Sequence, residues 1–188
     1  MQRIRRVLGA LLDTLLSPFR SPLSQAVIDQ ALFQGSAPEL IYVLTLRGYR
    51  LNEQSAGVIN DEGFGAYYFS RDGKHVQFRG DRGSFSDELC SLRPVTDSSA
   101  PVQWERDEVG WYRAGGEQHE YVVVRNDVIL VLAGKVAEVP RATLREAIAG
   151  ARHLTVTGHA EPGSAPAKRG DLPRTGDGAP NNTVGPGG

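Results

Sequence analysis

The chain has 188 residues, of which 40% are hydrophobic and 23% charged, and its net charge is −1 from 21 basic and 22 acidic residues. This balance is typical of a globular domain, and it argues against nucleic acid as a partner, because nucleic-acid-binding proteins usually carry a basic field. No stretch approaches the roughly 20 apolar residues that span a bilayer. Cys90 is the only cysteine, which excludes an intrachain disulfide and a Cys-rich zinc cluster. A single cysteine fits the cytosol, so we expect a cytoplasmic protein.

The N-terminus combines three arginines with an apolar run. Residues 4–16 carry apolar side chains at helical spacing, which predicts a helix with one apolar stripe. Arg3, Arg5 and Arg6 resemble the start of a signal peptide, but Asp13 interrupts the run, so we expect it to belong to the mature protein. Cations in a first helical turn oppose the helix dipole. These arginines are therefore the candidate contact for an acidic partner or an anionic membrane, although we expect the stripe to dock on its own domain.

Two further helices are expected before residue 48. Ser21-Pro22 and Gly35 bracket a helix over about 22–34. Pro38 and Gly48 bracket a second one over 38–47, with a buried strand as the alternative because Ile41 to Leu46 is nearly all apolar.

The middle of the chain shows the alternation of an antiparallel meander. Asp72-Gly73 and Asn126-Asp127 are hairpin-turn signals, and residues 80–83 suggest another turn. Pro94 to Pro101 is expected to be a polar loop. The expected strands are 49–51, 58–59, 66–70, 75–79, 84–92, 102–105, 110–113, 120–124 and 128–132.

A final helix is expected over 141–153, and the Gly- and Pro-rich residues from 158 onward are expected to be disordered because they bury too little surface. The predicted fold class is α+β, with N-terminal helices, an antiparallel β-meander, one C-terminal helix and a disordered tail. The predicted segments are 1–35 (helical), 36–157 (α+β core) and 158–188 (tail).

No residue pattern points to catalysis, a cofactor or a metal. The histidines lack metal-ligand spacing and are expected to be exposed. Cys90 is expected in the core, since no base is visible that would activate it. The adjacent acids Asp61-Glu62 and Asp87-Glu88 would point to opposite faces of a strand and build no catalytic dyad. There is no phosphate-binding loop or nucleophile elbow. We therefore assign no catalytic, cofactor-binding or metal-binding residue.

Two segments resemble parts of known families. His75–Phe85 is similar to a strand-turn-strand of small bacterial immunity-type proteins, and Val139–Ala147 resembles the closing strand-helix unit of some extracytoplasmic bacterial domains. No functional residue is transferred from either resemblance.

The function expected from these observations is a non-enzymatic protein-binding module, of the immunity or accessory type, with another protein as its partner. The alternatives are a small enzyme whose acids come together from several strands, and a membrane-peripheral protein held by its first helix.

Overall fold

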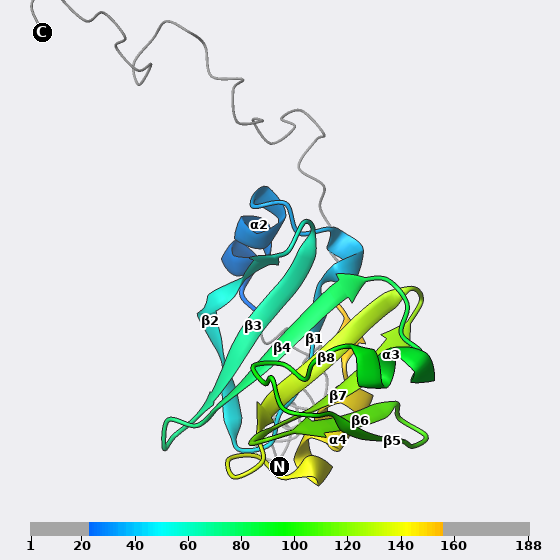
Figure 1. The fold of residues 1–188 in the computed structure, drawn as a ribbon. Coiled ribbons are helices and arrows are strands. Elements are labelled where there is room, and N and C mark those ends of the chain that lie inside the picture. The colour runs from blue at the N-terminus through cyan, green and yellow to red at the C-terminus, as the bar shows by residue number, and fades with distance from the viewer. Residues whose placement is uncertain (1–22, 156–188) are drawn as a thin grey trace, which may run out of the picture. The chain divides into compact units, whose positions relative to one another are not determined.

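The computed structural model describes residues 23–155, which form a large antiparallel sheet with short helices on both faces (Figure 1). The predicted α+β class with an antiparallel sheet is confirmed. The predicted first helix, over 4–16, and the predicted tail lie outside the described residues. The strands of this large sheet are β2 (Tyr49–Ile59), β3 (Gly63–Ser70), β4 (His75–Arg82), β5 (Gln103–Arg106), β6 (Trp111–Gly115), β7 (Gln118–Arg125) and β8 (Val128–Lys135).

The seven strands lie in the order β2-β3-β4-β8-β7-β6-β5. Two meanders, β2-β3-β4 and β5-β6-β7-β8, therefore meet where β4 pairs with β8. The chain between β4 and β5 does not make a hairpin, since these strands lie far apart in the sheet. The prediction of a single continuous meander is therefore corrected: the sheet consists of two meanders joined through β4 and β8.

Both hairpin-turn signals are confirmed. In the β3–β4 turn, the Ser70 N–H donates to Lys74 O at 2.9 Å and Gly73 has φ 83°. Asn126 and Asp127 have φ 49° and 63° and form a two-residue turn between β7 and β8. The turn expected at 80–83 is wrong, because β4 continues to Arg82.

One face of the sheet packs against helix α4 (Arg141–Ala149) and the segment before β2. Leu130 and Leu132 of β8 are fully buried, as are Leu144 and Ile148 of α4, and α4 contacts β7 and β8. The expected helix over 141–153 ends early, and β9 (Arg152–His153) pairs with β1 (Tyr42–Val43).

The helix expected over 38–47 is wrong. A 3₁₀ turn, η1 (Pro38–Leu40), leads into β1, so the alternative of a buried strand holds at Tyr42–Val43. Residues 40–44 are all buried. A segment enclosed on every side needs no polar face, and for that reason its apolar run carries no helical period.

The opposite face of the sheet carries helix α3 (Asp87–Leu92), where a strand over 84–92 was expected. The strand expectation is wrong, and with it the strand-turn-strand suggested by the resemblance of His75–Phe85. Cys90 is fully buried, as predicted, in an apolar cluster that covers this face. The cluster consists of Phe85, Cys90, Trp111, Val122, Ile129 and Val131.

Helix α2 (Gln25–Phe33) packs beside β2, which is a single long strand with an irregular register between Asn52 and Gly57 (Figure 1). The Ser24 N–H donates to Glu53 Oε1 at 2.7 Å. A side chain added at Gly57 would meet Gln34, which immediately follows α2. The second half of β2 is therefore the half that α2 covers. None of the helices in residues 23–155 has the length and apolar character that a bilayer crossing requires.

Candidate functional site

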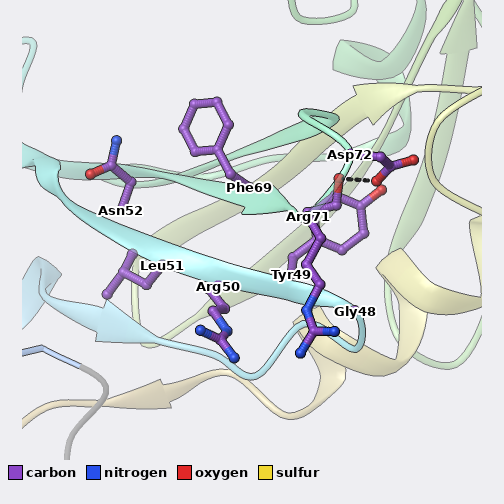
Figure 2. A pocket seen from close by; sticks show the side chains of 9 residues that line it. Gly48, Tyr49, Arg50, Leu51, Asn52, Phe69, Arg71 and Asp72 are labelled. Atoms are coloured by element: carbon purple, nitrogen blue, oxygen red, sulfur yellow. Dashed lines mark hydrogen bonds between the residues drawn. The ribbon is translucent and has the colours of Figure 1, made fainter.

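A shallow groove of about 710 Å³ lies where β2 begins and β3 ends (Figure 2). Residues 48–52 line it on one strand, and residues 69–72 line it on the other strand and in the turn that follows. The cross-strand pairs Tyr49–Ser70 and Arg50–Phe69 bring these two segments together. No motif in the sequence pointed to this groove.

Two arginines mark the groove. Arg50 lies on β2 and Arg71 lies in the β3–β4 turn, and both guanidinium groups lie beside the start of β2 (Figure 2). Arg50 is the cross-strand partner of Phe69, and Asn52 follows two residues later, so these three side chains leave the same face of the sheet. Arg47 is exposed and directly precedes Gly48, which also lines the groove. We call Arg47, Arg50 and Arg71 the arginine corner.

The arginine corner differs from the rest of the described chain in its lack of partners. Within residues 23–155, these three are the arginines whose side chains have no acidic, hydrogen-bonding or aromatic partner. By contrast, Arg82 pairs with Glu39 and Glu62, both at 2.6 Å. Unpaired guanidinium groups beside a groove are donors available to a carboxylate or another anion.

The acid in the groove does not neutralise the corner. The Asp72 carboxylate accepts a hydrogen bond from Ser70 Oγ at 2.7 Å and pairs with Lys74 Nζ at 2.8 Å. The hydrogen bond from Lys74, assisted by that from Ser70, lowers the pKa of Asp72 to about 2. Asp72 and Lys74 therefore cancel one another, and the charges of Arg50 and Arg71 remain uncompensated.

Hydrogen bonds of two tyrosines hold in place the strand ends that line the groove. The Tyr49 hydroxyl donates to the carbonyl of Glu138 at 2.8 Å, and burial raises the pKa of this phenol. The Tyr68 hydroxyl similarly donates to Leu44 O at 3.3 Å. These bonds tie β2 and β3 to the segments beneath them, so the arginines project from a fixed backbone.

On the same face of the sheet as Arg50, three rings of β3 and β4 lie together. Tyr67, Phe69 and His75 contact one another with ring centroids 5.9 to 6.4 Å apart, and Phe69 is 39% exposed. The strands bring the three rings together, because Phe69 pairs with His75 across β3 and β4.

The most enclosed charges form a separate network. Arg113 and Glu120 are 2% and 0% exposed, face one another across β6 and β7, and form an ion pair. Glu120 also accepts hydrogen bonds from Thr96 N at 2.9 Å and Thr96 Oγ1 at 2.6 Å. Arg113 in addition donates to the carbonyls of Cys90 and Arg93. With these partners, the network fastens α3 and the following loop to the sheet.

A second acid, Asp107, is held by a different set of groups. Its carboxylate accepts hydrogen bonds from Val109 N at 2.9 Å, the Tyr121 hydroxyl at 2.9 Å and Arg145 Nε at 3.1 Å. Burial alone would raise the pKa of Asp107, but these hydrogen bonds outweigh burial, and the net shift is downward. Asp107 therefore stays ionised and links the β5–β6 turn to α4.

The histidines do not all follow the expectation of exposure. His119 is buried, which is a correction; its Nδ1 lies 3.1 Å from the Tyr112 hydroxyl, and burial lowers its pKa. The sequence did contain a signal, because residue 119 lies two positions before Tyr121 and four before Val123, and it therefore shares their face of the strand. In residues 23–155, no three His, Cys, Asp or Glu side chains are grouped as metal ligands.

The sequence-predicted contact residues Arg3, Arg5 and Arg6 lie outside the described residues, and their role stays a prediction. No family model matches this chain, and neither the curated proteins nor the solved structures contain a match.

Proposed function

We propose that this chain is a non-enzymatic binding module whose arginine corner binds an acidic segment of another protein. The observation that carries the proposal is the absence of acidic partners at Arg47, Arg50 and Arg71 in a described chain whose other arginines have partners. An acidic partner would supply the missing carboxylates. An immunity-type or accessory protein would use such a corner to hold its partner.

The groove suits a weak or electrostatically selected interaction. Single exposed ion pairs contribute about 0–1 kcal/mol, so three of them give specificity and rapid association more than high affinity. The guanidinium fork favours planar, bidentate contact with carboxylates. Binding should therefore weaken as salt is raised, because exposed charges are screened over about 10 Å at 0.1 M salt.

Two enclosed carboxylates, Glu120 and Asp107, support a non-enzymatic function. Glu120 is bonded to Arg113 and Thr96 inside the protein, and Asp107 is bonded to Tyr121 and Arg145. Both have structural partners at each oxygen, and neither lines the groove.

The test uses the full chain and a fluorescein-labelled peptide, Glu-Val-Glu-Val-Glu-Val-Glu, followed by fluorescence anisotropy. The double variant Arg50→Gln/Arg71→Gln should weaken binding by about tenfold, the loss expected for two exposed charge pairs. The control is Arg82→Gln, which removes one exposed charge, against two in the double variant, and leaves the corner intact; it should bind within about twofold of wild type.

Three outcomes would contradict the proposal. The peptide could fail to bind at low salt, or Arg82→Gln could weaken binding as much as the corner variant, which would indicate net charge alone. An eight-nucleotide oligothymidylate or anionic vesicles could bind the corner more tightly than the peptide, and the partner would then be of another class.

A further inference from the structure

We propose that the acidic partner binds as an added β-strand along the first half of β2, next to Tyr49–Asn52. This inference rests on the proposed function and specifies the conformation of the bound segment. It follows from the free edge of the sheet, the direction of the backbone groups on that edge, and the position of the arginine corner.

β2 is an edge strand of the large sheet, with β3 as its neighbour on one side. No strand of the described chain pairs with its other side. Helix α2 covers that side near Glu53 and Gly57. No strand or helix of residues 23–155 pairs with that side at residues 49–52, which also line the groove. An open strand edge is a template for an extended segment of another chain.

The hydrogen bonds show which backbone groups face the open edge. The Tyr49 N–H donates to Leu46 O at 3.1 Å, rather than to its cross-strand neighbour Ser70. Ser70 itself bonds to Lys74 O, away from β2. Since backbone groups of successive residues alternate in direction along a strand, those of Arg50 point to β3 and those of Leu51 point to the open edge. The Leu51 N–H and C=O are thus available to an incoming strand.

The arginine corner determines which side chains the incoming strand must have. Side chains of an extended segment alternate between two faces. Arg50 leaves the face of the sheet that also carries Phe69, and the Arg71 guanidinium lies near it at the start of β2 (Figure 2). Acidic side chains at every second position of the segment would all lie on the side of the guanidinium groups. The partner is therefore an extended segment in which acidic residues alternate with apolar or β-branched residues, which favour strand conformation.

The first experiment uses N-methylated forms of the alternating peptide. Methylating two valine amides or two glutamate amides removes donors from one edge of the bound strand and leaves the charge unchanged. One version should lose about tenfold in affinity, as expected for two backbone hydrogen bonds, and the other should bind within about threefold of the unmodified peptide. Equal affinities, or equal losses, would overturn strand addition. Binding of the unmodified peptide through Arg50 and Arg71 would still uphold the proposed function.

The second experiment changes the protein. Leu51→Pro removes the outward N–H at an edge position where proline is tolerated, and Leu51→Ala removes the side chain but keeps the N–H. We expect Leu51→Pro to weaken peptide binding severalfold more than Leu51→Ala, with both variants folded by circular dichroism. If Leu51→Ala is as weak as Leu51→Pro, backbone pairing is not the cause.

Two other occupants would also overturn the inference. A dimer of the full chain that Leu51→Pro dissociates, detected by sedimentation, would identify a second copy as the occupant. Tighter peptide binding after Glu161→Gln, Asp171→Asn and Asp177→Asn would identify the chain's own C-terminal acids as the occupant.

Discussion

Replacing Arg113 by Met should be among the most damaging single changes in the described domain. The substitution keeps a long apolar side chain in place but removes the guanidinium that lies between Glu120, Cys90 O and Arg93 O. Glu120 is 0% exposed and would be left as a buried carboxylate with only Thr96 as donor. Breaking a buried ion pair in this way costs about 3–5 kcal/mol.

The magnitude can be measured by urea denaturation followed by tryptophan fluorescence. We expect the midpoint to fall with an unchanged denaturant slope, and the thermal midpoint to fall by about 10–20 °C. The matched control is Arg82→Met, which removes an arginine from an ion pair on the exposed end of β4. Its effect should be much smaller, because solvent screens exposed pairs.

A second substitution separates charge from packing. Adding Glu120→Gln to Arg113→Met removes the stranded charge and should recover at least about 1 kcal/mol, although the carbonyls of Cys90 and Arg93 stay without their donor. A loss below about 1 kcal/mol for Arg113→Met alone, or a double variant less stable than the single one, would refute this reasoning about the network.

Three further predictions concern turns and a buried phenol. Gly73→Val should destabilise the domain by about 1 kcal/mol or more, because residue 73 has φ 83° and a Cβ there meets no atom within 4 Å, so the cost is conformational and not steric; a neutral result in urea denaturation would contradict it. Asp127→Gly should stabilise the domain by about 0.5 kcal/mol, since residue 127 has φ 63° in a turn that favours Asn-Gly; a lower urea midpoint would count against this turn geometry. Burial raises the pKa of Tyr68 to about 12 from 10.0, so its contribution of about 3 kcal/mol is present below pH 10 and is lost as pH rises toward 12. Tyr68→Phe should abolish that part of the alkaline stability loss, and an absorbance titration in which all tyrosines of the folded protein ionise near pH 10 would disprove it.

The parts of the fold that could be predicted from sequence are those fixed by local backbone chemistry. Asp72-Gly73 and Asn126-Asp127 supply residues that tolerate positive φ, and the structure has positive φ at Gly73, Asn126 and Asp127. The strands on either side of these turns followed from alternation. The β4–β8 pairing could not be predicted in this way, because it joins residues about fifty positions apart without a turn between them.

The two wrong element types have different causes. Residues 40–44 are enclosed on all sides, so their apolar run has neither a period of 2 nor one of 3.6. Residues 84–92 did contain a helix signal: Ser86 precedes Asp87 and Glu88, which lie in the first turn of α3, where acids favour the helix dipole. The apparent strand alternation around Cys90 outweighed that signal in the sequence interpretation.

The candidate site could not be predicted because it is defined by missing partners. Arg82 and Arg50 are equivalent in sequence terms, each an arginine on a strand near charged residues. The fold brings Glu39 and Glu62 to Arg82 from segments 43 and 20 residues away, and it brings no acid to Arg50. Whether an arginine is available for a partner is thus a consequence of strand order and register. The same register leaves the Leu51 backbone on an open edge. For this reason we propose that the partner's acidic side chains and its backbone are bound at the same place, next to the start of β2.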